Sequence, residues 1–279
     1  MPEIRSGFLL MVSLLWCCAP AKPSRELRVC ADPNNLPFSN RRGEGFENKL
    51  AQLIASELKS KVEYVWWPQR RGFIRNTLGA GKCDVIMGIN HGAERILTTR
   101  PYYRSSYVFV YRKDRGLDVR SLDDPQLRTL RIGVQLVGDD YANTPPVHAL
   151  SRRGIVGNLI GYSLFGDYSQ ANPPARVMDA VLAREVDLAV VWGPLAGYFA
   201  KRSGIELEIV PVTPSEDPPG LRFTFDISLG VRAGDEARRQ ELESVLRKKR
   251  DAIARILQDY GVPLASDFPA ELSSLAPSR

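Results

Sequence analysis

The sequence has few of the residues that hold metal ions. It contains two histidines, His91 and His148, which lie far apart in the chain, and four cysteines. Zinc and similar ions are held by closely spaced His, Cys and carboxylate ligands, and no group of these residues has such a spacing. We therefore predict no metal site, and we predict no cofactor.

The sequence also lacks a long hydrophobic run after its N-terminus. Residues 1–21 combine Arg5, an apolar core at 8–16 and a small-residue cleavage signal at 19–21. This pattern is typical of a secretory signal peptide, and its apolar core is too short to cross a bilayer. We expect an exported chain without a membrane span and predict a periplasmic location.

The low cysteine count leaves at most one disulfide in the mature chain. Cys17 and Cys18 lie in the signal peptide, where a lipid anchor is the weaker alternative because the residue before a lipidated cysteine has to be small. Cys30 and Cys83 remain, each on a predicted strand. They can form a bridge in an oxidising compartment if the two strands are neighbours. Two buried free thiols are the alternative.

Positive charge is in excess but is not concentrated. Lys and Arg total 38 against 32 Asp and Glu, which gives a formal net charge of +6. Such an excess favours an acidic ligand or an acidic protein surface through long-range attraction. The basic residues are scattered and aromatic residues do not interleave with them in a stripe, so we predict no binding to nucleic acid. The basic run at 247–250 is interpreted as the solvated face of a helix.

The first part of the chain alternates strand patterns with helix patterns. Short apolar or β-branched runs predict strands at 27–31, 62–67 and 85–87. Apolar residues at spacings of three and four predict a helix from Gly45 to Leu58, and a second helix is predicted near 72–78. This β-α-β-α-β order predicts an α/β fold with a parallel sheet and right-handed crossovers.

A second α/β unit is predicted after Tyr111, where the sequence becomes charged and rich in turn residues. Thr144 is the expected cap of a helix that has Pro145 and Pro146 in its first turn. The segment 193–204 is interpreted as strand, loop and helix, with Gly204 as the stop. The predicted strands are 130–135, 186–192, 205–212 and 223–231, and the predicted helices are 147–153, 174–185 and 235–260.

Two extended segments, 108–111 and 223–231, connect these units and predict two lobes with a hinge. Each lobe contributes strand ends to a cleft between them. We predict that lobe 1 comprises residues 22–110 and 226–268, that lobe 2 comprises 111–225, and that 269–279 form a flexible tail.

Candidate binding residues lie where the predicted strands end. Open α/β sheets bind ligands beyond the carboxyl ends of their strands, and the turn after strand 85–87, with the short helical piece expected there, carries several polar groups. The candidates are Asp32, Phe38, Trp67, Asn90, Arg95, Gln135, Asp139, Tyr141 and Trp192. The alternatives are core packing for the aromatic residues, a helix cap for Asp139, and an ion pair of Arg95 with Glu94 or Asp84.

The order of several segments resembles a known family. These segments are LRVCADPNNLPFS, GFENKLAQLIA, VEYVWWPQ, GKCDVIMG, AERILTTRPYYRSSYVFV and GVRAGDE. Together they are similar to type II periplasmic solute-binding proteins of the amino-acid-receptor kind. PYYRSSYVFV and CADPNNLPFS resemble, more narrowly, the quinoprotein-dehydrogenase-associated binding proteins of the MoxJ and XoxJ type. The resemblance covers essentially the whole mature chain and implies a two-lobed fold.

The resemblance also implies roles for two positions. Arg95 occupies the place of an arginine that holds the ligand carboxylate through two hydrogen bonds in amino-acid receptors. Those receptors place an acidic residue after the strand that corresponds to 186–192, where it meets the ligand ammonium, and this chain has Gly193 there. A buried ammonium without a partner costs roughly 1–3 kcal/mol or more. The departure argues against ordinary amino-acid binding.

Three functions follow from the sequence. The first is an accessory protein that docks with a periplasmic methanol or alcohol dehydrogenase dependent on pyrroloquinoline quinone (PQQ) and aids its maturation or activation. The second is a receptor that delivers a small anionic solute or amino acid to an ABC permease. The third is an enzyme on this fold, for which Glu94, Asp139 and His91 are poorly spaced as acid and base. We favour the first and expect no catalysis.

Overall fold

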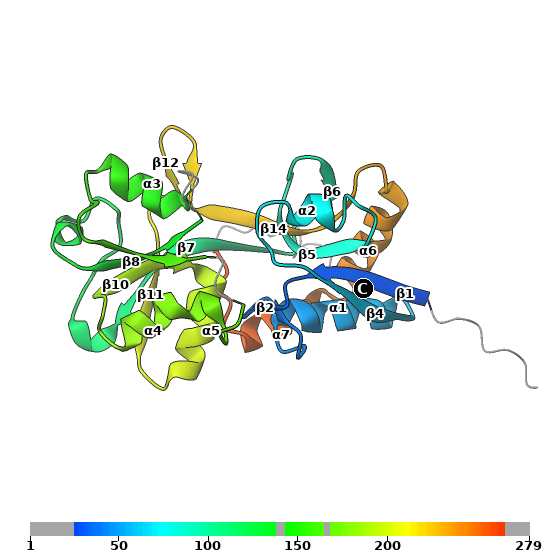
Figure 1. Ribbon diagram of the computed structural model, residues 1–279, viewed down its shortest axis with the longest axis horizontal. Coiled ribbons are helices and arrows are strands. Elements are labelled where there is room, and N and C mark those ends of the chain that lie inside the picture. The colour runs from blue at the N-terminus through cyan, green and yellow to red at the C-terminus, as the bar shows by residue number, and fades with distance from the viewer. Residues whose placement is uncertain (1–24, 138–142, 165–167, 266–279) are drawn as a thin grey trace, which may run out of the picture.

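The computed structural model describes residues 25–137, 143–164 and 168–265. The chain forms two lobes side by side along the long axis, each with strands covered by helices (Figure 1). The predicted signal peptide and tail lie outside the described residues. Within the described part of the chain, no helix is long and apolar enough to cross a membrane.

Lobe 1 is built on a parallel β-α-β-α-β unit, as predicted. β1 (Arg25–Ala31) lies between β4 (Ser60–Trp66) and β5 (Val85–Asn90) and pairs in parallel with both. α1 (Phe46–Glu57) follows β1, and α2 (Phe73–Asn76) follows β4. The apolar stripe of α1 is buried as its spacing predicts, because it packs against this sheet.

Lobe 2 has a second parallel core. β8 (Ile132–Leu136) lies between β10 (Leu188–Trp192) and β9 (Leu159–Ser163) and is parallel to both. β11 (Leu207–Pro211) pairs antiparallel with β7 (Tyr103–Arg112). The helices of this lobe are α3 (Pro145–Arg152), α4 (Arg176–Leu182) and α5 (Gly193–Ser203).

Two long strands, β7 and β14 (Thr224–Arg232), connect the lobes (Figure 1). Residues 103–106 of β7 pair antiparallel with β14, and residues 107–112 pair with β10 and β11. β14 continues into lobe 1, where it pairs with β5 and with β6 (Ile96–Thr98). The expected sheets of the two lobes are therefore linked through these strands into one hydrogen-bonded path.

The apolar cores stay separate even though the sheets are linked. Tyr103 and Leu229 pack in the cluster of lobe 1, whereas Phe109 and Phe223 pack in a cluster of lobe 2. β7 thus changes lobes near Ser106, a few residues before the predicted boundary at 110. Such short extended crossings allow two rigid lobes to move relative to each other.

The C-terminal helix differs from the prediction. The single helix expected at 235–260 is broken into α6 (Glu236–Lys248) and α7 (Arg250–Asp259). Both helices bury apolar residues in the lobe 1 cluster, and a break at Lys249 lets each turn its own apolar face toward that core. Lys248 and Lys249 form ion pairs with Glu57 of α1, so this part of the basic run binds the protein's own surface.

Several short elements were not predicted. The turn after β5 leads directly into β6 instead of a helical piece, α5 begins at Gly193 without a preceding loop, and β9 forms where no strand is predicted. Thr144 precedes α3 as expected, but its hydroxyl donates to the Gln135 carbonyl at 2.9 Å instead of capping the helix. The remaining elements are β2 (Asn34–Asn35), β3 (Ser39–Asn40), β12 (Glu216–Asp217), β13 (Leu221–Arg222) and the 3₁₀ helices Lys113–Arg115, Pro125–Arg128 and Pro173–Ala175.

A disulfide joins Cys30 to Cys83, with 5.6 Å between the two Cα atoms. Cys30 lies on β1, and Cys83 lies two residues before β5 instead of on a strand as predicted. The bridge is possible because β1 and β5 are neighbours in the sheet. Phe73 and Leu78 pack around it and form a small separate core.

Candidate functional site

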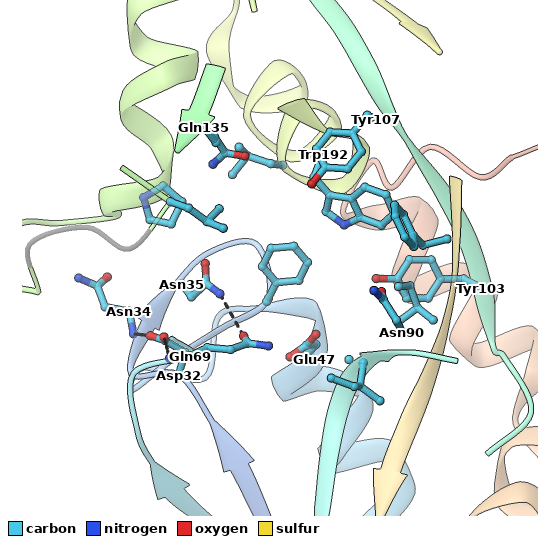
Figure 2. Close-up of a pocket in the computed structure, with 18 of the residues that line it drawn as sticks. Asp32, Asn34, Asn35, Glu47, Gln69, Asn90, Tyr103, Tyr107, Gln135 and Trp192 are labelled. Carbon is cyan, nitrogen blue, oxygen red and sulfur yellow. Dashed lines mark hydrogen bonds between the residues drawn. The ribbon is translucent and has the colours of Figure 1, made fainter. Parts of the chain in front are cut away.

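A cavity of about 510 Å³ lies between the two lobes. Its walls come from the ends of β1 and β5, the start of α1, the crossing strands β7 and β14, and the ends of β8 and β10. Figure 2 shows polar side chains on the lobe 1 side and aromatic side chains toward the crossing strands. This is the place where the strand ends of two α/β units meet, as the sequence predicts.

Five of the nine candidate residues line this cavity. They are Asp32, Phe38, Asn90, Gln135 and Trp192. Each follows or ends a strand, or lies in the loop after one, and reaches the cavity from there. Asp139 and Tyr141 lie outside the described residues.

Trp67 and Arg95 do not lie on the cavity wall. The Trp67 ring packs against the core around the disulfide, with Lys82 Nζ 5.2 Å from the ring centre, and Gln69 reaches the cavity in its place. Arg95 is exposed in the turn between β5 and β6 and has a positive φ of 66°. The chain turns there to pair β6 with β14, which carries Arg95 away from the strand end.

Asp32 is held by three hydrogen bonds and is 2% exposed. Its Oδ1 accepts from the Asn34 backbone N–H at 2.8 Å, and its Oδ2 accepts from the Gln69 backbone N–H at 2.6 Å and from the Tyr168 hydroxyl at 2.7 Å. These donors satisfy most of the carboxylate's accepting capacity. Asp32 therefore organises the loops around the cavity and leaves little for a ligand to bond.

Residues of the two lobes meet across one side of the cleft. Tyr168 of lobe 2 bonds Asp32 of lobe 1, and Asn34 donates to the Gln170 carbonyl at 2.7 Å while its Oδ1 accepts from the Asn172 N–H at 3.4 Å. Burial and the bond to Asp32 both raise the pKa of Tyr168, so it remains a neutral donor. The cleft is closed on this side.

Glu47 is a cavity residue that the sequence reasoning missed. It lies in the first turn of α1, and only 8% of the residue is exposed. Burial, with a smaller contribution from the Asp32 charge, raises the pKa of this carboxyl to about 8. A Cβ atom on Gly88 would overlap Glu47 Oε1, so glycine at position 88 makes room for the carboxyl. The sequence signal that could have identified Glu47 is an acidic residue directly after Phe46, at the start of the apolar stripe of α1.

Aromatic rings form the wall along the crossing strands. Tyr107, Trp192 and Phe225 pack edge to face, with ring centres 5.4 to 6.4 Å apart. Phe38 and Tyr103 also line the cavity. Burial raises the pKa of Tyr107 and of Tyr103. Among the described residues that line the cavity there is no lysine or arginine.

Gly193 sits where no side chain fits. A Cβ atom there would lie 2.8 Å from Pro263 Cγ and from the Ser106 carbonyl oxygen, and 2.9 Å from Ser105 Oγ. β7 and the segment after α7 together cause this crowding, and Ser105 Oγ of β7 donates to the Pro263 carbonyl at 2.6 Å, which holds that segment beside β7. The packing excludes an acidic side chain from this position.

Two α/β lobes that are joined by two strands, with a cavity at the facing strand ends, define a type II periplasmic binding protein. Residues 27–262 match the family of bacterial extracellular solute-binding proteins, family 3, and the chain belongs to this family.

Its relatives include the protein MoxJ of Methylorubrum extorquens, which is 33% identical over 254 residues, covering 88% of this chain and 83% of MoxJ. The crystal structure of the periplasmic binding protein XoxJ from Methylobacterium extorquens AM1 is similar, with a TM-score of 0.70 and 41% identity over 86% of this chain and 99% of XoxJ. The crystal structure of MxaJ from Methlophaga aminisulfidivorans MPT matches with a TM-score of 0.72 and 29% identity over 86% of this chain and all of MxaJ. The chain is thus a MoxJ/XoxJ-type member of the family, as its sequence motifs predict.

Proposed function

We propose that this protein is a periplasmic accessory protein of a PQQ-dependent methanol or alcohol dehydrogenase and aids its maturation or activation. The observation that carries the proposal is the absence, from the described cavity wall, of a cationic side chain that could hold the carboxylate of an amino acid. No described lysine or arginine lines the cavity, and the packing at Gly193 leaves no room for an acidic side chain. Its membership of the MoxJ/XoxJ type supports this function over amino-acid delivery.

The absence of a cationic partner for a ligand carboxylate lowers the expected affinity for an amino acid. A zwitterionic amino acid in this cavity would place its carboxylate among aromatic rings and the Glu47 carboxyl, without a cationic partner among the described residues. A buried charge without a partner costs at least about 1–3 kcal/mol. At that cost, an affinity useful for amino-acid transport is not expected.

The second candidate is a transport receptor that delivers a small solute to an ABC permease. The two-lobed architecture and the cavity between the lobes favour it, since both are what a transport receptor needs. The two candidates differ in the partner that they predict. An accessory protein binds the dehydrogenase, whereas a transport receptor binds a permease.

Purification of the tagged mature chain from a periplasm that contains the PQQ-dependent dehydrogenase tests the proposal. We expect the dehydrogenase to co-purify, and we expect the purified enzyme to be less active when it is produced without this protein. An unrelated exported binding protein with the same tag serves as control. A thermal-shift screen of the twenty amino acids runs in parallel. A clear stabilisation by one amino acid, with no dehydrogenase in the eluate, would overturn the proposal in favour of transport.

A further inference from the structure

We propose that the cavity binds a small organic cation, an ammonium compound without a carboxylate, through the Glu47 carboxylate and the surrounding aromatic rings. This ligand class differs from the small anionic ligand expected from the sequence. The inference concerns the cavity alone and does not depend on the dehydrogenase partner.

The carboxyl of Glu47 has no hydrogen-bond partner among the described residues. The residue is more than nine-tenths buried, and its carboxyl lines the cavity (Figure 2). Among the described residues, none donates a hydrogen bond to this carboxyl. The carboxyl therefore faces the cavity with its hydrogen-bonding capacity unused by the described protein, and a ligand in the cavity can bond to it. An ammonium group of a ligand supplies both charge and, where it has N–H groups, hydrogen bonds.

The ionisable groups around the cavity are acidic. Apart from tyrosines, Glu47 and Asp32 are the only ionisable side chains among the described lining residues, and both are carboxyls. Asp32 already accepts three hydrogen bonds, which leaves Glu47 as the free group. The Asp32 charge attracts a cation and repels an anion across the cavity, and the Glu47 carboxyl does the same once it is ionised.

Aromatic rings form much of the cavity wall. Tyr103, Tyr107 and Trp192 line the same cavity as Glu47, together with Phe38 and Phe225. Aromatic faces attract cations by roughly 0.5 to 2 kcal/mol each, and the rings also bury the methyl or methylene groups of an organic ammonium. A carboxylate on the ligand would gain nothing from these rings. Arg95, the residue expected to hold such a carboxylate, is exposed away from the cavity.

Binding of a cation is coupled to proton release. The groups that act on Glu47 are Asp32, whose charge raises its pKa, and the nearby hydroxyls of Tyr64, Tyr102 and Tyr103, which remain protonated. Burial and Asp32 raise the Glu47 pKa to about 8, so the empty site holds a proton at neutral pH. A ligand cation favours the ionised form and displaces that proton. Binding therefore strengthens as pH rises from 6 to 9.

Isothermal titration calorimetry with choline and with 3,3-dimethylbutan-1-ol tests the proposal, since the alcohol is the uncharged isostere of choline. We expect the wild-type chain to bind choline at least tenfold more tightly than the isostere, and about tenfold more tightly at pH 9 than at pH 6. Glu47→Gln should weaken choline binding at pH 9 at least tenfold and remove the pH dependence. Glu63→Gln, at an exposed position on β4, is the matched control and should bind like the wild type.

Four results would each overturn the proposal. They are equal binding of choline and its isostere, unchanged choline binding by Glu47→Gln, tighter binding of succinate or glutamate than of choline, and no choline binding at millimolar concentration. Gly88→Ala is a second variant, because its methyl group would displace the Glu47 carboxyl without removing its charge. It should also weaken choline binding, and circular dichroism shows whether either variant is folded.

Discussion

The Tyr168 hydroxyl of lobe 2 donates a 2.7 Å hydrogen bond to Asp32 Oδ2 of lobe 1. The two residues are more than a hundred positions apart in the chain and lie on opposite sides of the cleft. Asp32 also binds the backbone N–H groups of Asn34 and Gln69. Closure of the lobes is thereby coupled to the conformation of two loops that border the cavity.

Loss of the Tyr168 hydroxyl should favour an open cleft. Tyr168→Phe removes one bond across the lobes, and a hydrogen bond to a charged group contributes about 1.5–3 kcal/mol. We expect a larger radius of gyration by small-angle X-ray scattering and faster amide exchange in residues 32–35. Tyr162→Phe is the control, since no hydrogen bond to the Tyr162 hydroxyl is present among the described contacts. Identical scattering of the Tyr168 variant and the wild type would show that this bond does not hold the lobes together.

Glu47 should make the protein less stable as pH rises. Its pKa in the folded state is about 8, above the ordinary value of 4.5, so the folded chain holds the proton more tightly than the unfolded chain. The effect of this pKa shift on the free energy of unfolding is therefore zero below pH 4.5. The free energy of unfolding falls between pH 4.5 and pH 8, and the loss is largest above pH 8. One pKa unit corresponds to about 1.4 kcal/mol. The difference in free energy of unfolding between Glu47→Gln and the wild type should therefore shift in favour of the variant by roughly 1–4 kcal/mol from pH 5 to pH 9.

Urea unfolding of the wild type, Glu47→Gln and the exposed-site control Glu63→Gln at pH 5 and pH 9 measures this difference. The free energies of unfolding of Glu47→Gln and Glu63→Gln should differ only at pH 9. A constant difference between Glu47→Gln and the wild type at both pH values would mean that the carboxyl is ionised throughout the range.

A side chain at position 193 should disrupt the packing between α5 and the segment after α7. Gly193→Ala places a methyl group within 2.9 Å of Pro263, Ser105 and Ser106. Forcing atoms into a packed region typically costs about 1–3 kcal/mol. We expect Gly193→Asp to cost more and to create no amino-acid site. Thermal unfolding measures both variants, and Gly157→Ala, which would meet no atom within 4 Å, is the control. Amino-acid binding by a stable Gly193→Asp variant would contradict this account.

The bridge between Cys30 and Cys83 should contribute substantially to stability. It closes a loop with a sequence separation of 53 residues, and loss of such a bridge typically costs about 2–4 kcal/mol because the unfolded chain gains freedom. Unfolding with and without dithiothreitol measures the effect, and the double variant Cys30→Ala, Cys83→Ala should be insensitive to the reductant. Equal stability of the wild type in both conditions would contradict the prediction.

Much of the fold could be predicted because its signals are local. The apolar stripe from Phe46 to Leu58 marks α1, the short runs around Val29 and Val85 mark strands, and their alternation predicts a parallel sheet. The elements that were missed depend on distant partners. β6 exists because it pairs with β14, and the break at Lys249 exists because α6 and α7 face one core from two directions.

The candidate site was only partly predictable for the same reason. The sequence by itself determined the alternating elements, the strand ends that carry Asp32, Asn90, Gln135 and Trp192, and the presence of two cysteines that could pair. Only the tertiary structure decided which of these side chains share a cavity. Pairing of β6 with β14 directs Arg95 away from the cavity. Helix α1 places Glu47 in the cavity wall, and Pro263 occupies part of the space next to Gly193. Which side chains meet at a cleft depends on how the two lobes pack and on where the chain crosses between them. No short stretch of sequence encodes that packing.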